Sequence, residues 1–165
     1  MRRLRTLAAL PFLAVAVAIV ATAPAAGAAN CKPIHARFVQ TQVTTGCLSP
    51  VGFCSTAQID SGLLKGTKTF TALGVRSSAG LDATEPATTF SYAGPVLIAT
   101  DQGDLLVSFV GVYDTANAVF SELGRVTSGT GRFTDATGIL FVTGNVTGGG
   151  MVFESVMTGD VCLAQ

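Results

Sequence analysis

The side chains that could do chemistry in this sequence are few, and they lie on predicted strands. Glu154 shares one strand face with Val152 and Val156. If that face lines a cavity, loss of hydration would raise the pKa of the carboxyl group and suit it to acid or base catalysis. If the face is external, Glu154 is a surface residue between two valines. The sequence leaves both interpretations open.

Arg125 and Tyr113 are two further candidates for a cavity site. Arg125 shares a strand face with Leu123 and Ser121, so it could hold an anionic ligand or form a surface ion pair. Tyr113 and Tyr92 are the only tyrosines, and either could offer a hydroxyl group to a cavity or pack in the core. Arg125 and Tyr113 therefore join the glutamate as candidate catalytic residues.

Other kinds of active site find no support in the sequence. His35 is the only histidine and no G-x-S-x-G motif is present, which disfavours a serine hydrolase. Asp101 and Asp104 lie in one predicted turn, but two carboxylates are too few for a dedicated calcium site. We therefore predict neither a metal site nor a cofactor.

The four cysteines indicate disulfides. An even number of cysteines in an exported chain is typical of a disulfide framework. Zinc is disfavoured because the cysteines include no C-x2-C pair and the histidine is not positioned near a cysteine cluster. Among the three pairings we prefer Cys47 with Cys54, which closes a short loop, and Cys31 with Cys162, which joins the chain ends.

Residues 1–29 have the layout of a cleaved signal peptide. Three arginines in the first five residues precede the apolar run Leu7–Val20 and then a stretch of small residues. Cleavage would leave one secreted or periplasmic domain, residues 30–165, with no membrane attachment. The alternatives are an uncleaved anchor and a lipid-anchored Cys31, although Asn30 is not the small residue that lipidation requires.

The charge of the mature chain excludes one class of partner. Three of the 10 basic residues lie in the signal segment, so 7 basic residues remain against 10 acidic ones. A nucleic-acid-binding protein would need a cationic surface, so we expect no nucleic-acid partner. With 48% hydrophobic and 12% charged residues, the chain is also not intrinsically disordered.

The rest of the sequence reads as strands separated by turns, without helical periodicity. Polar, glycine-containing turns at 100–103 and 147–150 indicate two hairpins. An eighth strand is predicted in either Gln58–Ser61 or Val161–Leu163. The other seven predicted strands are Pro33–Val43, Gly62–Leu73, Thr88–Ala99, Asp104–Asp114, Ala118–Thr127, Gly138–Val146 and Met151–Thr158.

Both faces of the later strands are apolar, so the sheet must be covered on both sides. Phe109 and Val110, for example, point to opposite faces of one strand. A closed barrel packed against another subunit would cover both faces, and so would a sandwich. Glycines inside strands, such as Gly111 and Gly124, favour the barrel because they permit tight coiling. We predict an all-β fold, an antiparallel closed barrel of about eight strands, with a homo-oligomer as a further expectation.

A short signature follows the predicted strand Ala118–Thr127. Within it Phe133 is the only large apolar residue, so it should plug one end of the core. Residues 129–138, GTGRFTDATG, resemble the G-T-G-x-F-x-x-A-x-G signature of the allene oxide cyclase-like and dirigent-like β-barrel superfamily. The resemblance implies a closed barrel with an apolar cavity, often dimeric or trimeric. Known members guide cyclisation or radical coupling of apolar small molecules without a cofactor, and the signature itself carries no catalytic residue.

Three functions follow from these observations. The chain could bind an apolar small molecule, act as a cofactor-free cyclase or isomerase, or work through its surface as a structural or inhibitory protein. A buried ionisable group from Glu154, Arg125 or Tyr113 inside the barrel would favour catalysis, and a wholly apolar cavity would favour binding. A barrel filled with side chains would exclude both.

Overall fold

The computed structural model describes residues 30–77, 84 and 88–164. The predicted signal peptide lies outside these residues, as does most of the segment between 77 and 88. Within the described part, no helix has the length and hydropathy to cross a membrane.

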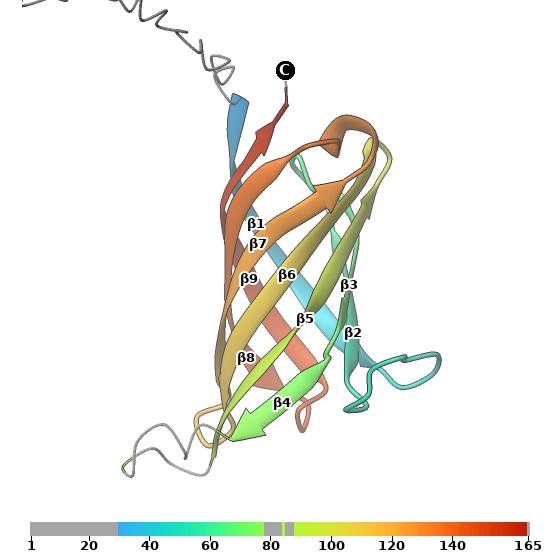
Figure 1. The fold of residues 1–165 in the computed structure, drawn as a ribbon. Helices are drawn as coiled ribbons and strands as arrows, with labels where there is room; N and C mark the ends of the chain where they lie inside the picture. The colour runs from blue at the N-terminus through green and yellow to red at the C-terminus, as the bar shows by residue number, and fades with distance from the viewer. Residues whose placement is uncertain (1–29, 78–83, 85–87, 165) are drawn as a thin grey trace, which may run out of the picture.

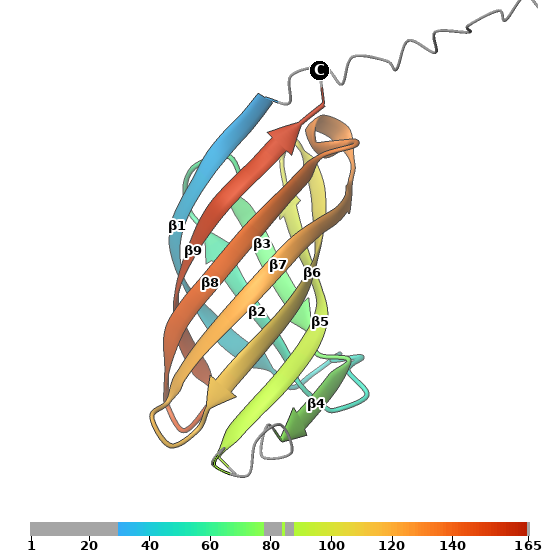
Figure 2. The ribbon, with the colours of Figure 1, turned by 60° about the vertical axis from the view of Figure 1, so that its left-hand side comes forward.

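The chain folds into one antiparallel sheet that closes on itself (Figures 1 and 2). The strand order is β3-β2-β1-β9-β8-β7-β6-β5-β4, and an additional pairing of β3 with β5 closes eight strands into a barrel. Strand β4 pairs with β5 beyond this closure. The strands are β1 (Asn30–Val43), β2 (Cys54–Ile59), β3 (Gly66–Thr71), β4 (Gly74–Ser77), β5 (Thr89–Thr100), β6 (Gly103–Asp114), β7 (Val119–Gly129), β8 (Thr137–Thr147) and β9 (Val152–Leu163).

The predicted all-β closed barrel is therefore confirmed, with three differences in its strands. The strand expected from Gly62 begins only at Gly66, because Gly62 lies in a turn with φ of 80°. The eighth barrel strand is β2, which begins at Cys54, and Val161–Leu163 is the end of β9. Strand β4 was not predicted, because a strand of four residues is too short to show a clear alternation of polar and apolar side chains.

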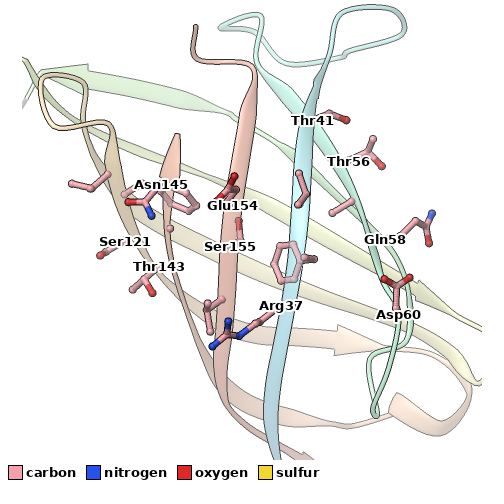
Figure 3. Close-up of a pocket in the computed structure, with 17 residues that line it drawn as sticks. Arg37, Thr41, Thr56, Gln58, Asp60, Ser121, Thr143, Asn145, Glu154 and Ser155 are labelled. Carbon is pink, nitrogen blue, oxygen red and sulfur yellow. The ribbon is translucent and has the colours of Figure 1, made fainter. Parts of the chain in front are cut away.

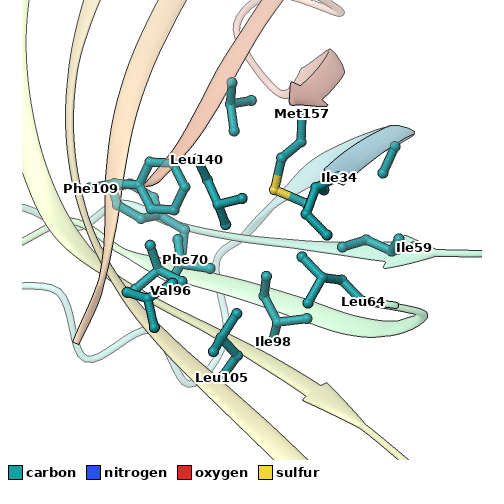
Figure 4. Packing of buried hydrophobic residues seen from close by; sticks show 14 of the residues in the cluster. Ile34, Ile59, Leu64, Phe70, Val96, Ile98, Leu105, Phe109, Leu140 and Met157 are labelled. Carbon is teal, nitrogen blue, oxygen red and sulfur yellow. The ribbon is translucent and has the colours of Figure 1, made fainter. Parts of the chain in front are cut away.

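One end of the barrel is filled by aliphatic side chains (Figure 4). The 3₁₀ turn η2 (Gly131–Phe133) lies at this end, and Phe133 is completely buried, as expected for a plug. These side chains are packed together in one hydrophobic core. The buried side chains shown there include Ile34, Ile59, Leu64, Ile98, Leu105, Leu140 and Met157.

Both predicted disulfides are present. Cys31–Cys162 joins the first strand to the last across 131 residues, and Cys47–Cys54 closes the connection between β1 and β2. No cysteine of the described residues is free. Two disulfides indicate an oxidising compartment, outside the cytoplasm.

A row of exposed apolar side chains crosses the outer face of strands β6, β7 and β8. Val110, Leu123 and Phe141 are neighbours across these strands, and their exposed fractions are 53%, 43% and 49%. The two apolar faces seen in the sequence thus correspond to a barrel interior and an exposed outer row.

Candidate functional site

A cavity of about 390 Å³ occupies the end of the barrel opposite the Cys31–Cys162 disulfide. Its rim includes Gln42, Thr115 and Gly150, which lie at or near the strand ends and turns of that side. The volume falls within the range of small-molecule sites. Seven aromatic residues line it: Phe53, Phe70, Phe90, Tyr92, Tyr113, Phe120 and Phe153.

Five of these rings form a continuous wall of edge-to-face contacts. Phe53 stands 6.1 Å from Phe70 and 5.6 Å from Phe153, measured between ring centres. Tyr92 extends the wall beyond Phe70 at 6.0 Å, and Phe120 extends it beyond Phe153 at 5.9 Å. Such contacts fix ring orientations, so the cavity has a defined apolar surface.

Glu122 places a carboxyl group inside this cavity. Its side chain is 8% exposed, and its Oε1 accepts a hydrogen bond of 2.8 Å from the hydroxyl group of Tyr92. Its Oε2 is the only buried side-chain nitrogen or oxygen in the described part of the chain that lacks a hydrogen-bond partner. Buried polar atoms are rarely left unpaired, so this oxygen requires an explanation.

Gly111 makes the contact between Tyr92 and Glu122 sterically feasible. Tyr92 on β5 faces Gly111 on β6, which in turn faces Glu122 on β7. A Cβ atom at Gly111 would lie only 2.6 Å from the Cζ atom of Tyr92. The missing side chain therefore lets the tyrosine ring lie across β6 and reach the glutamate.

Lys68 lies behind the cavity surface and is 1% exposed. Its Nζ donates a hydrogen bond to Oε1 of Gln40 and lies 5.5 Å from the ring centre of Phe38 and 6.0 Å from that of Phe109. Gln40 also donates from Nε2 to Ser155 at 3.0 Å. We call Gln40, Ser55, Lys68, Tyr92, Glu122 and Ser155 the polar layer.

Burial and opposite charge together set the ionisation of the polar layer. Burial lowers the pKa of Lys68 to about 8, although the negative charge of Glu122 opposes this shift. Burial raises the pKa of Glu122, and the charge of Lys68 and the Tyr92 hydrogen bond oppose that shift. Burial and the adjacent carboxylate also raise the pKa of Tyr92. The lysine and the glutamate thus favour each other's charged form.

The titration of Lys68 predicts that stability rises with pH above 8. The folded protein releases this proton near pH 8, whereas the unfolded chain holds it to about 10.5. In that interval the unfolded state binds more protons, so the free energy of unfolding should rise by about 2 kcal/mol between pH 8 and pH 10. Above pH 10 the opposite effect of Tyr92 sets in, because the unfolded tyrosine ionises first.

Urea unfolding of the oxidised protein at several pH values measures this rise. Lys68→Met removes the titrating group, so the curve of this variant should lack the rise. The same slope in the wild-type protein and in Lys68→Met would contradict the assignment.

The structure separates the three residues predicted from the sequence. Tyr113 lines the cavity and is half-buried. The cavity positions considered for Glu154 and Arg125 are wrong, because both side chains are exposed on the outer face. Figure 3 shows Glu154 in an outer hollow that Arg37 and Asn145 also line. On β9 the inward positions belong to Ser155 and its alternate neighbours.

Sequence reasoning missed the central residues of the polar layer. Glu122 has Phe120 and Gly124 on its own face, whereas Leu123 and Arg125 lie on the other. Both faces are mixed, so alternation could not select the inner one. Lys68 offered a clearer signal, because it shares a face with the buried Phe70.

Comparison with protein-family models, curated proteins and solved structures gave no match to this chain. The resemblance of residues 129–138 to a barrel superfamily therefore stays a hypothesis.

Proposed function

We propose that this chain is an exported binding protein that encloses one apolar small molecule in the aromatic cavity. The observation that carries the proposal is a space of about 390 Å³ lined by seven aromatic side chains in a barrel whose other half is filled. Transfer of an apolar ligand from water to such a surface is favourable. Binding of this kind requires neither a metal nor a cofactor.

A second candidate function is cofactor-free isomerisation or cyclisation. Glu122 favours it, because a buried carboxyl group hydrogen-bonded to Tyr92 in a cavity could exchange a proton with a bound substrate. The cavity walls would orient that substrate. The superfamily resemblance of residues 129–138 supports the same candidate, with Glu122 in the role that was considered for Glu154.

Obstruction of the cavity mouth tests the proposed binding. Val75 lines the cavity and is 46% exposed, so Val75→Trp adds bulk near the entrance. We expect the wild-type mature protein to bind the neutral dye N-phenylnaphthylamine at one molecule per chain, and Val75→Trp to weaken binding by about tenfold or more. Fluorescence titration of the dye measures both affinities.

Val39→Trp is the matched control, because Val39 is 54% exposed on the outer face of β1. It should bind the dye like the wild-type protein. Equal weakening by the two substitutions, or no binding to the wild-type protein, would contradict the proposal. Native mass spectrometry of mature protein from its own host distinguishes the candidate functions: a retained, unaltered ligand supports binding, and a substrate converted to product supports catalysis.

A further inference from the structure

The orphaned oxygen of Glu122 specifies a polar group on the ligand. Tyr92 occupies Oε1, whereas Oε2 is buried and unpaired on a side chain that lines the cavity. A buried carboxylate oxygen without a hydrogen bond is costly, and a ligand that supplies the missing donor removes this cost. The other side chains of the polar layer already have partners: Gln40 bonds Lys68, Ser55 and Ser155.

The charges of the interior specify the charge of the ligand. Lys68 and Glu122 are the only buried charged side chains among the described residues, and their charges are opposite. The interior is therefore balanced before a ligand enters. A cationic or anionic ligand would add an uncompensated charge to a space with mostly apolar walls, which is unfavourable.

We infer that the cavity takes a neutral alcohol with an apolar ring skeleton, whose hydroxyl group donates a hydrogen bond to Oε2 of Glu122. This inference rests on the proposed binding function and adds the class of ligand. The aromatic wall contacts the ring skeleton. Tyr92 already donates to Oε1, so the carboxylate form of Glu122 leaves Oε2 as a pure acceptor; burial raises the pKa of this carboxyl group, and the positive charge of Lys68 opposes the rise and favours that form. An aldehyde of the same skeleton offers only an acceptor and leaves Oε2 unpaired.

A matched set of probes tests this inference on the wild-type protein. Naphthylmethanol, methylnaphthalene, naphthaldehyde and the naphthylmethylammonium cation share one ring system and differ in one group. We expect isothermal titration calorimetry at neutral pH to show the alcohol binding at least about tenfold more tightly than the other three, as for a hydrogen bond to a charged group.

Glu122→Gln provides a second test, because it replaces the acceptor Oε2 with an amide that donates. In this variant the preference for the alcohol over the aldehyde should shrink to about threefold or less. Glu154→Gln, the same substitution on the outer face, should keep the wild-type preference. If Glu122→Gln does not fold, the probe series on the wild-type protein still tests whether the cavity prefers the alcohol.

The possible failures are distinguishable. Equal affinity for the alcohol and the hydrocarbon would overturn the inference and leave the binding function standing, as would tightest binding of the cation. An unchanged preference in folded Glu122→Gln would also overturn the inference. Failure of all four probes and of N-phenylnaphthylamine to bind would overturn both proposals.

Discussion

Replacement of Cys31 and Cys162 by serine is expected to lower the free energy of unfolding by about 5 kcal/mol. The bond closes a chain segment across 131 residues, so it restricts nearly the whole unfolded chain. It also fixes the pairing of β1 with β9, where the two cysteines face each other. Small domains have total stabilities of about 5–15 kcal/mol, so the variant should lie near the limit of folding.

Urea unfolding of the double-serine variant, with Cys47–Cys54 intact, measures this loss. The comparison is Cys47→Ser with Cys54→Ser, because this bond spans only 7 residues and should contribute about 2 kcal/mol. Equal losses in the two variants would show that restriction of the unfolded chain is not the dominant effect.

Glu122→Leu is expected to cost about 3–5 kcal/mol at neutral pH, because it leaves Lys68 buried without an opposite charge among the described residues. The pKa of Lys68 should then fall below its value of about 8, since the attraction of Glu122 is what raises it against burial. Chemical denaturation gives the loss of stability, and NMR titration of the lysine side chain gives the change in pKa.

A second substitution should reverse this loss. Lys68→Met in the Glu122→Leu background replaces the whole pair by apolar groups, and stability should return to within about 1 kcal/mol of the wild-type protein. Glu154→Leu is the surface control, and an exposed substitution of this kind should change stability by no more than about 0.5 kcal/mol. A Glu122→Leu variant no less stable than Glu154→Leu would disprove the coupling.

The two ends of the barrel interior differ: one is filled by the hydrophobic core and the other contains the candidate site. At the end with the Cys31–Cys162 disulfide, aliphatic side chains and Phe133 fill the space. At the other end, aromatic rings meet edge to face and leave a cavity. The polar layer contains two buried opposite charges, Lys68 and Glu122, which are a weak source of stability and for which apolar residues would often substitute. Its place in the cavity fits the ligand recognition that we propose.

Several features of the fold could be predicted because they depend on local sequence. Period-two alternation and glycine-rich turns located seven of the nine strands, including both hairpins. The cysteine count and positions indicated both disulfides, and the isolated Phe133 indicated the plug of the core. Each of these patterns is visible within a short segment of sequence, except the pairing of Cys31 with Cys162, which was inferred from their positions near the two ends of the chain.

The site could not be predicted in the same way. Alternation shows which residues share a face of a strand, but it does not show which face is inside when both contain apolar residues. Glu154 lies between two valines on a face that proved external, and Glu122 lies three residues before Arg125 on the opposite face of the same strand. Only the closed sheet, through its pairing of β3 with β5, distinguishes the two carboxyl groups.

The amino-acid sequence alone determined an all-β chain with paired cysteines, because strand propensity, turns and cysteine number are properties of short segments. Tertiary structure decided that Lys68, Tyr92 and Glu122, from three strands, share one interior. The physical reason is that strand register and barrel closure arise from contacts between distant segments. Whether a charge is hydrated or buried, and so what chemistry it can do, depends on those contacts.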